Sequence, residues 1–402
     1  LRPTLLRPSI FNIVKFSNDE CYDGGNQSGT CYTPLECKAF GGSATAMCAN
    51  GYGTCCIISK SCHNTTSQKV VYFKNPSYPS TDNQQNFCDL TIDIKDSDIC
   101  QIRLDFLDFQ LDPPKEGQCL GDKLTISASK QATSTIPTLC GLNRNSHIYI
   151  NVPQDTIPRS VSILFVTNSE GPYRWHLRIT QIECINKLGN RQQKSFFSFI
   201  PPASLKISVP APPHCLQYYT ASTGVIESFN FGDYLNNLDY AICIERLPDT
   251  CKVIFTAMDN EWSIEKTGTS LPSSGVGDEQ CKSDYLMISG GSETGDGPTY
   301  DRYCGKRLNF EKDSQISKPV ITKANGPIVL RFHSDQYYKS EYKEGFRLHF
   351  QQENNNCVSR TNTFSNLYFH SPSALNSNSI GIQSNNENTR VVRRSNTKRL
   401  VL

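Results

Sequence analysis

The 18 cysteines of this 402-residue chain fall into three consecutive groups of six. An even number in each group, with long intervals between neighbours, indicates a disulfide framework made in an oxidising compartment. The groups divide the chain into a small N-terminal head and two larger domains. The first group is Cys21, Cys31, Cys37, Cys48, Cys55 and Cys56; the second is Cys62, Cys88, Cys100, Cys119, Cys140 and Cys184; the third is Cys215, Cys243, Cys251, Cys281, Cys304 and Cys357.

The two larger groups repeat one set of motifs in the same order. Residues 122–127 match residues 284–289, and each segment follows shortly after a cysteine. The run around Cys140-Gly141 matches the run around Cys304-Gly305, and residues 175–179 match residues 346–350. Because the order never breaks, the sequence indicates a duplicated domain.

The repeated segments alternate apolar and polar residues with a period of two. Trp175, Leu177 and Ile179 share one face, as expected of a half-buried strand and not of an amphipathic helix. In the run 101–111 the alternation changes phase between Phe106 and Leu107, which predicts a β-bulge. Many such short runs, separated by Pro, Gly and Asn, predict an all-β chain with an antiparallel β-sandwich in each copy.

The overall charge and hydropathy exclude two classes of protein. Lys and Arg number 40 and Asp and Glu number 38, so no basic excess supports nucleic-acid binding. No apolar run approaches the ~20 residues that cross a bilayer. The chain opens at Leu1 without a signal-peptide core, so we expect a mature or truncated product whose export signal is gone. With the cysteines, the glycosylation sequons at Asn26 and Asn64 predict a secreted glycoprotein.

Three segments outside the cysteine groups are predicted to be connections or tails. Residues 1–20 form an N-terminal extension, and the Pro-rich residues 185–214 form a stiff linker whose phenylalanines could fold back onto a domain. Residues 358–402 are rich in Asn and Ser and are predicted to be disordered. Arg393 or Arg394 in that tail could be a protease processing site; the alternative is a solvated charge cluster.

Residues 62–184 and 215–357 resemble CUB domains. The first copy contains Phe73-Lys74-Asn75-Pro76-Ser77-Tyr78-Pro79 before its second cysteine, similar to a motif of that family. The second copy lacks this motif, but Phe332-His333-Ser334-Asp335 and Gly345-Phe346 are similar to the family's C-terminal motif. The resemblance implies two tandem antiparallel β-sandwich domains of the CUB jelly-roll-like type.

The resemblance also implies a disulfide pairing. The family's two pairs correspond to Cys62–Cys88 and Cys119–Cys140 in the first copy, and to Cys215–Cys243 and Cys281–Cys304 in the second. We expect the remaining cysteines to pair as Cys100–Cys184 and Cys251–Cys357, so that each copy looks like the CUB domains of arthropod extracellular proteins. Such a long loop would stabilise the fold by about 4–5 kcal/mol on the chain-entropy model.

The head, residues 21–61, resembles a clip module. The likeness lies in a G-x-C-x5-C run early in the segment and in the adjacent Cys55 and Cys56 at its end. By that likeness the pairs would be Cys21–Cys55, Cys31–Cys48 and Cys37–Cys56. Six cysteines permit 15 connectivities, so an unrelated disulfide-rich module stays open as the alternative.

Many CUB domains hold a calcium ion with acidic residues from three loops. The resemblance implies Glu261, Asp284 and Asp335 as the ligands in the second copy, and calcium prefers six to eight such oxygen ligands. The alternative is three exposed loop acids. The long insertion 263–280 could displace Glu261 or supply ligands of its own. The resemblance further implies that a Lys or Arg of a partner protein binds the remaining carboxylate oxygen.

The first copy is a poorer match to this calcium site. Its corresponding positions are Asp112, Asp122 and Asn168. An amide in place of the third carboxylate carries no charge and would weaken calcium binding.

Catalytic motifs are not found in the sequence. It contains neither G-x-S-x-G nor H-E-x-x-H, and the cysteines are all expected in disulfides. His176 and His349 alternate with apolar residues and are expected on strand surfaces. Asp105 and Asp108 lie on a predicted strand without an identifiable acid or base partner. We therefore expect no enzyme activity.

The predicted function is a secreted, non-enzymatic protein that binds other extracellular proteins, with calcium at its second domain. One alternative is a non-catalytic regulatory chain of a serine-protease cascade in immunity or development. Another is glycan binding, in which exposed tyrosines would stack on sugars. The alternative for these tyrosines is that they are rim or core residues. These tyrosines are Tyr218, Tyr219, Tyr337, Tyr338 and Tyr342.

Overall fold

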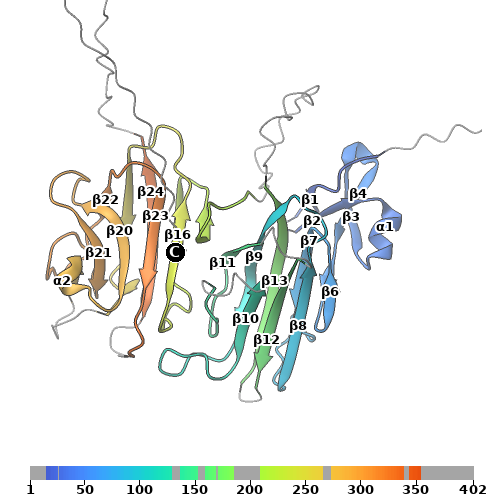
Figure 1. The fold of residues 1–402 in the computed structure, drawn as a ribbon, viewed down its shortest axis with the longest axis horizontal. Coiled ribbons are helices and arrows are strands. Elements are labelled where there is room, and N and C mark those ends of the chain that lie inside the picture. The colour runs from blue at the N-terminus through green and yellow to red at the C-terminus, as the bar shows by residue number, and fades with distance from the viewer. Residues whose placement is uncertain are drawn as a thin grey trace, which may run out of the picture. The chain divides into compact units, whose positions relative to one another are not determined.

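The computed structural model describes residues 15–25, 27–128, 136–152, 159–168, 171–184, 209–265, 273–338 and 344–354. These residues belong to one compact unit and are mostly in strands, as the period of two predicts (Figure 1). Several predicted features lie outside the described residues. They are most of the N-terminal extension and of the linker, Asn26, Tyr342, Cys357, and the tail with Arg393 and Arg394.

The head is a small four-stranded sheet with one short helix. The strands pair in the order β1-β2-β4-β3. The helix begins after Thr33, whose hydroxyl accepts a hydrogen bond from the Glu36 amide while the Glu36 carboxylate accepts one from the Thr33 amide, a capping box. The elements are β1 (Glu20–Tyr22), β2 (Ser28–Tyr32), α1 (Pro34–Ala39), β3 (Ser43–Cys48), the 3₁₀ turn η1 (Ala49–Gly51) and β4 (Gly53–Ile57).

The first domain consists of two sheets, in the orders β10-β12-β8-β6 and β11-β9-β13-β7-β5. Strand β12 alternates buried and half-buried residues along its whole length, because one of its faces lies on the core. The strands are β5 (Ser59–Lys60), β6 (Asn64–Thr66), β7 (Val70–Lys74), β8 (Asn86–Asp93), β9 (Ile99–Gln110), β10 (Lys123–Ala128), β11 (His147–Asn151), β12 (Ser160–Thr167) and β13 (Arg174–Glu183).

The predicted bulge lies in β9, where that strand pairs with β13. Asp108 pairs with His176 and Phe106 pairs with Leu177, so Leu107 has no opposite residue. The side chain of Leu107 is 37% exposed, whereas Phe106 and Phe109 on either side are buried. The change of phase in the sequence is therefore a bulge that returns Phe109 to the core.

The strands of the second domain form one hydrogen-bonded sheet, in the order β14-β16-β23-β20-β22-β17-β24-β15, to which β18, β19 and β21 add. Pairing between β20 and β22 joins its two halves. The elements are β14 (Cys215–Tyr219), β15 (Thr223–Glu227), β16 (Asp239–Ile244), β17 (Lys252–Thr256), β18 (Trp262–Ser263), β19 (Ser274–Val276), α2 (Gly277–Gln280), β20 (Tyr285–Ser292), β21 (Tyr300–Gly305), β22 (Val320–Thr322), β23 (Ile328–His333) and β24 (Gly345–Glu353).

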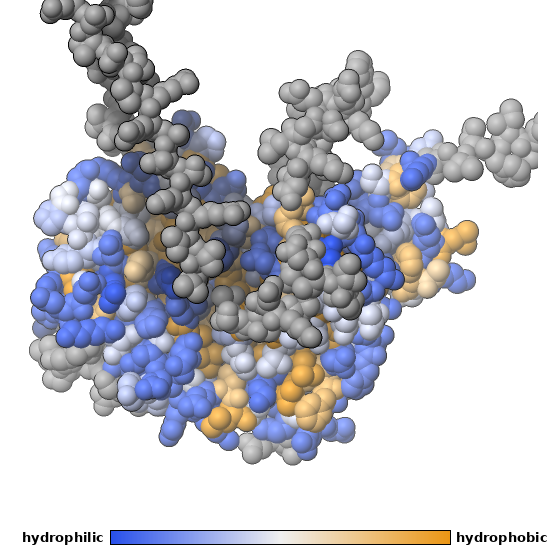
Figure 2. Space-filling view, viewed as in Figure 1, coloured by the Kyte–Doolittle hydropathy of each residue, from blue (hydrophilic) through white to orange (hydrophobic). Residues whose placement is uncertain are grey.

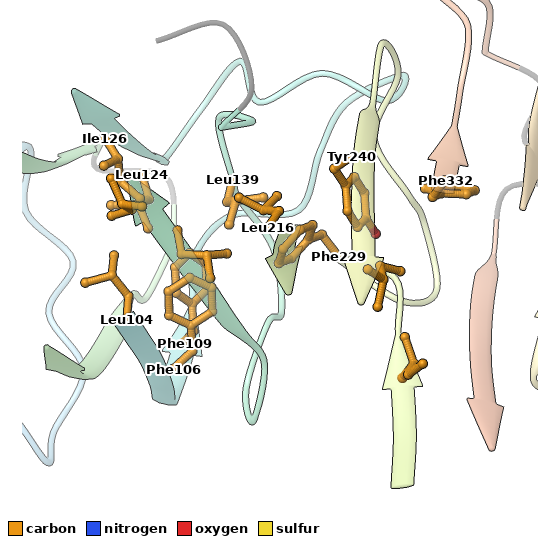
Figure 3. Packing of buried hydrophobic residues seen from close by; sticks show 14 of the residues in the cluster. Leu104, Phe106, Phe109, Leu124, Ile126, Leu139, Leu216, Phe229, Tyr240 and Phe332 are labelled. Atoms are coloured by element: carbon orange, nitrogen blue, oxygen red, sulfur yellow. The ribbon is translucent and has the colours of Figure 1, made fainter. Parts of the chain in front are cut away.

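Large aromatic side chains fill the cores of both domains. In the first, the rings of Phe165 and Trp175 stack at 4.0 Å, and in the second the rings of Phe332 and Phe346 meet edge-on at 5.1 Å. Buried residues of the head and of both domains belong to one hydrophobic cluster, part of which Figure 3 shows. Such burial supplies most of the free energy that stabilises the fold.

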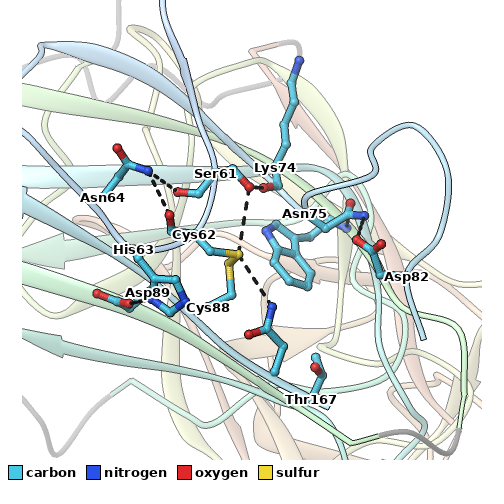
Figure 4. Close-up of a disulfide and its surroundings, with 12 residues drawn as sticks. Ser61, Cys62, His63, Asn64, Lys74, Asn75, Asp82, Cys88, Asp89 and Thr167 are labelled. Carbon is cyan, nitrogen blue, oxygen red and sulfur yellow. Dashed lines mark hydrogen bonds and ion pairs between the residues drawn. A yellow bond between two sulfur atoms is a disulfide. The ribbon is translucent and has the colours of Figure 1, made fainter. Parts of the chain in front are cut away.

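Disulfides join the pairs that the resemblances implied, wherever both cysteines are described. In the first domain Cys62–Cys88 joins the segment between β5 and β6 to strand β8 (Figure 4). Cys251 is disulfide-bonded, and Cys357, its expected partner, lies outside the described residues. The other pairs are Cys21–Cys55, Cys31–Cys48, Cys37–Cys56, Cys100–Cys184, Cys119–Cys140, Cys215–Cys243 and Cys281–Cys304.

The head is attached to the first domain by hydrogen bonds as well as by the chain. The Tyr72 hydroxyl of β7 donates to the carbonyl of Ser28 and accepts from its amide, both at 3.0 Å. Arg178 of β13 donates to the Ser28 hydroxyl at 3.3 Å. Strand β5, at the C-terminal end of the head segment 21–61, pairs with β7 of the first domain. The head is therefore held on the first domain by hydrogen bonds and strand pairing, and not by the covalent chain alone.

The face of the molecule shown in Figure 2 is mostly hydrophilic, with hydrophobic residues scattered over it. Large hydrophobic side chains that are exposed include Leu35 and Met47 in the head, Phe87 in the first domain and Met258 in the second. Scattered residues of this kind are normal on protein surfaces. Among the described residues, none of the helices has the length and hydropathy needed to cross a membrane.

Candidate metal centre

Three acidic residues meet at one end of the second domain. Asp284 directly precedes β20, Asp335 follows β23 by two residues, and Glu265 follows β18 by two residues. One carboxylate oxygen from each lies within 4.8 Å of the others. Asp284 is fully buried, Glu265 is 2% exposed and Asp335 is half-buried. Three strand ends of a folded sheet thus bring together acids that are far apart in sequence.

Hydrogen bonds fix the positions of these carboxylates. The Asp335 amide donates to Asp284 Oδ1 at 2.7 Å, and the Tyr337 amide donates to Asp335 Oδ1 at 2.8 Å. The Tyr234 hydroxyl donates to Asp284 Oδ2 and accepts from the Glu265 amide at 3.3 Å. Burial, and then the charge of Asp284, raise the pKa of Tyr234 well above its ordinary value, so this hydroxyl keeps its proton.

The donor set suits a hard divalent cation. Carboxylates and a tyrosine hydroxyl offer oxygen atoms alone, as calcium prefers, and backbone carbonyls or water could complete the coordination. Two unit charges within 4.8 Å repel by at least about 3 kcal/mol at an effective dielectric constant of ~20. A dication among the three carboxylates would replace that repulsion by attraction.

Comparison with known proteins identifies the two domains. The CUB domain model matches residues 62–174, and the animal CUB domain model matches residues 212–353. Together the two matches span more than half of the chain. The chain belongs to the CUB domain family. CUB domains mediate interactions between extracellular proteins. A search of curated proteins found no match to the chain.

Among solved structures, the CUB1-EGF-CUB2 domains of MASP-1 are similar to this chain. The rat protein is 15% identical, covers 72% of this chain and 100% of its own, and has a TM-score of 0.25. The human MASP-1/3 domains are 17% identical, with 71% and 100% covered and a TM-score of 0.25. The MASP-1 CUB2 domain bound to Ca2+ is 22% identical, with 30% and 98% covered and a TM-score of 0.24. The assignment to the family rests on the two family matches.

The acidic cluster of the second CUB domain differs in one residue from the calcium ligands expected from the sequence. Asp284 and Asp335 come together, but the third acid is Glu265 and not Glu261. The Glu261 carboxylate instead accepts hydrogen bonds from the Met258 amide at 3.1 Å and from His349 Nε2 at 3.0 Å. The insertion begins at Ser263, the second residue of β18. Glu261 therefore lies in the turn before β18, whereas Glu265, two residues after this strand, lies in the cluster.

The first CUB domain has the same framework with a different third residue. Asp122 is fully buried and accepts a hydrogen bond from the Asn168 amide at 2.8 Å, as Asp284 accepts one from Asp335. Asp112 lies close by, because a Cβ built on Gly121 would lie 2.9 Å from the Asp112 carboxylate and 3.0 Å from the Asn168 amide. The three expected positions therefore meet, with two carboxylates instead of three.

Of the two histidines expected on strand surfaces, His176 is buried and His349 is half-buried. His176 is 9% exposed and packs between the rings of Tyr72 and Tyr78 at 5.3 and 4.8 Å. The expectation was wrong because the loop that carries Tyr78 covers this part of β13. Burial, and then the nearby Lys74, lower the pKa of His176 to about 4, so it is neutral at physiological pH.

Asp105 is also buried, and it is part of an ion-paired group that the sequence did not reveal. Arg103 and Arg178 contact its two carboxylate oxygens at 2.7 and 2.8 Å. Burial would raise the pKa of Asp105, but the two arginines outweigh it and hold the pKa below its ordinary value. Asp108 pairs with Arg174 at 2.7 Å. Both acids therefore stabilise the strand arrangement.

The tyrosines considered for glycan stacking have different surroundings. Tyr218 and Tyr219 pack against the aromatic residues His147, Tyr149 and Phe350. Tyr338 is half-buried, whereas Tyr337 is 63% exposed beside Asp335.

The second sequon lies beside a disulfide. The Asn64 amide nitrogen donates to the carbonyls of Ser61 at 3.2 Å and Cys62 at 2.9 Å, close to the Cys62–Cys88 bridge (Figure 4). A glycan on this nitrogen would have to displace at least one of these hydrogen bonds.

The sequence alone did not predict Glu265 or Tyr234 as residues of the acidic cluster. Glu265 stands inside the insertion, where family spacing gives no guidance, although it is the one acidic residue of the sequence between Trp262 and Gly277. Tyr234 belongs to a loop without a charged motif, so its role follows from the fold alone.

Proposed function

We propose that this chain is a secreted, non-enzymatic protein that binds other extracellular proteins through its second CUB domain, with calcium in the metal centre. The observation that carries the proposal is the convergence of Glu265, Asp284 and Asp335 within 4.8 Å, two of them buried. A bound calcium ion would compensate these charges and hold three loops in one arrangement.

The surface beside the metal centre suits a partner with a basic side chain. A hollow of about 430 Å³ is lined by Asp335 together with Asp239, His333 and Tyr337. Since Asp335 is half-buried, a carboxylate oxygen can face this hollow while the residue also contacts the ion. A Lys or Arg of a partner protein would pair with it across the rim of the hollow.

Calorimetry on the full chain tests the metal. Wild-type protein should release or absorb heat on calcium addition, Asp335→Ala should not, and Glu293→Ala should behave as wild type because Glu293 is exposed and outside the cluster. Equal heats for wild type and Asp335→Ala would refute the calcium site.

Affinity capture tests the partner. The chain should retain a protein from extracellular fluid in calcium and lose it when calcium is chelated. Capture that is the same with and without chelator would contradict calcium-dependent binding.

A second candidate function rests on the head. Its disulfides Cys21–Cys55, Cys31–Cys48 and Cys37–Cys56 have the order that a clip-like module implies. A non-catalytic chain of a protease cascade would co-purify with a zymogen. Glycan binding is the third candidate, since Tyr337 is exposed; a glycan array with Tyr337→Ala as the comparison would test it.

A further inference from the structure

One loop of the second CUB domain, residues 228–238 between β15 and β16, contacts the metal centre. Its Tyr234 hydroxyl donates a hydrogen bond to the Asp284 carboxylate. Its Asn237 amide donates to the carbonyl of Asp335 at 2.8 Å. The position of this loop is therefore tied to two of the three acidic residues, to the carboxylate of Asp284 and to the backbone of Asp335.

The same loop contacts the first CUB domain at two places. The Asn236 amide donates to the Gly117 carbonyl at 2.9 Å. At the other end of the loop, the Leu142 amide donates to Asn230 Oδ1 at 3.0 Å, and the Asn230 amide donates to Asn143 Oδ1 at 2.8 Å. Two turns of the first domain thus bind the loop that holds the metal centre.

Asn236 connects the two sets of contacts directly. Its side-chain nitrogen donates to the Glu116 carbonyl in the first domain at 3.0 Å and to the Gln336 carbonyl in the second at 3.2 Å. Gln336 is the residue after Asp335. A shift of the Asp335 loop therefore changes a hydrogen bond shared with the first domain.

From these contacts we propose that cation binding at the metal centre and docking of the first CUB domain onto loop 228–238 are thermodynamically coupled. A cation held by Asp284 and Asp335 fixes Tyr234 and Asn237, and so presents Asn230 and Asn236 in the arrangement that the first domain binds. By reciprocity, the docked first domain must increase the affinity for the cation by the same factor. The inference rests on the calcium site proposed above.

A substitution in the first domain tests the coupling without changing the metal centre. Gly117 has φ +73°, and a Cβ built on it would collide with the carboxamide of Asn236. Gly117→Ala should therefore weaken the contact between the domains. The matched control is Gly51→Ala in the head: Gly51 has φ +89°, so the backbone strain is similar, but its Cβ would meet nothing within 4 Å.

Calcium titration of the full chain gives the first readout. Gly117→Ala should raise the dissociation constant for Ca2+ by about 2- to 10-fold, the equivalent of one or two neutral hydrogen bonds. Gly51→Ala should leave it unchanged. Should Gly117→Ala fail to fold, Asn143→Ala removes the acceptor of the Asn230 amide and should have an effect of the same size.

Hydrogen exchange gives the reciprocal readout. The Leu142 amide reports the contact from the first domain, and calcium should slow its exchange in the wild type but not in Asp335→Ala. If calcium binds equally tightly to wild type and Gly117→Ala while the Leu142 amide exchanges faster in the variant, the coupling is refuted and the calcium site stands. If the wild type binds no calcium, both proposals fail.

Discussion

Replacing Glu265 or Glu261 one at a time distinguishes the metal centre of the structure from the one that family spacing suggests. Glu265→Gln removes one of the three clustered carboxylates and keeps the size of the side chain. Glu261→Gln removes a carboxylate that is bound to His349 and to the Met258 amide instead. Calcium binding should therefore depend on the first substitution and not on the second.

The expected size follows from the number of charges lost. Substitutions around metal ligands typically cost 10- to 100-fold in affinity, and loss of a charged ligand should cost about 100-fold or more. At a calcium concentration 100 times the wild-type dissociation constant, the ion stabilises the wild type by about 2.7 kcal/mol. With a dissociation constant about 100-fold higher, Glu265→Gln would gain only about 0.4 kcal/mol under the same conditions.

Urea unfolding in calcium and in chelator measures this difference for each protein. Comparing each variant with itself removes any effect of the substitution on the ion-free fold. A Glu261→Gln variant that loses the calcium stabilisation while Glu265→Gln keeps it would refute the assignment of Glu265. Glu293→Gln serves as an exposed control.

Three other predictions follow from polar side chains that the fold holds in hydrogen bonds or ion pairs. Asp105→Asn leaves Arg103 and Arg178 without their shared counter-ion and should lower the free energy of unfolding by about 3–5 kcal/mol, as measured in urea at pH 7. Because the pKa of Asp105 is lowered in the folded state, the difference in stability between wild type and variant should shrink as the pH falls below about 4. Burial, and then Arg103, lower the pKa of His147 to about 4, so this histidine takes up a proton at a higher pH in the unfolded chain than in the folded one. The free energy of unfolding should therefore fall by on the order of 3 kcal/mol between pH 6.5 and 4, and this fall should be absent in His147→Gln. Asn64 should be largely unglycosylated in secreted protein, because its amide nitrogen already makes two hydrogen bonds; peptide mass spectrometry showing full occupancy would contradict this.

The sequence predicted those parts of the fold that local patterning determines. Alternation with a period of two gave the strands, and its change of phase placed the bulge at Leu107. Burial of one sheet face enforces this alternation, so the information is present in every strand. Cysteine order together with the family resemblance gave the pairing, because strands in a fixed order bring the same cysteines together.

The parts that were not predicted depend on contacts between distant loops. His176 has the alternation of a surface residue, yet the loop bearing Tyr78 covers it. Asp105 pairs with Arg178, 73 residues away, across the pairing of β9 with β13. Glu265 reaches the metal centre only because β18 pairs with β24 and sets where the insertion begins. Local sequence does not contain any of these three relations.

The two CUB domains of this chain share the backbone framework of the acidic cluster but differ in the number of carboxylates that it carries. In both, a fully buried aspartate accepts the amide hydrogen of the residue that follows a core strand: Asp122 from Asn168, and Asp284 from Asp335. This hydrogen bond holds two loops together whether or not a cation is present, so it explains why both domains keep the buried acid. The second domain has a carboxylate, Asp335, where the first has Asn168, and its third acid, Glu265, comes from the insertion, whereas the first domain has Asp112. The number of clustered carboxylates is therefore a property of side chains on a shared backbone framework. Asn168→Asp in the first domain should bring the charge of its three positions to that of the second, and calcium titration of this variant would test whether the charge is what the proposed calcium site requires.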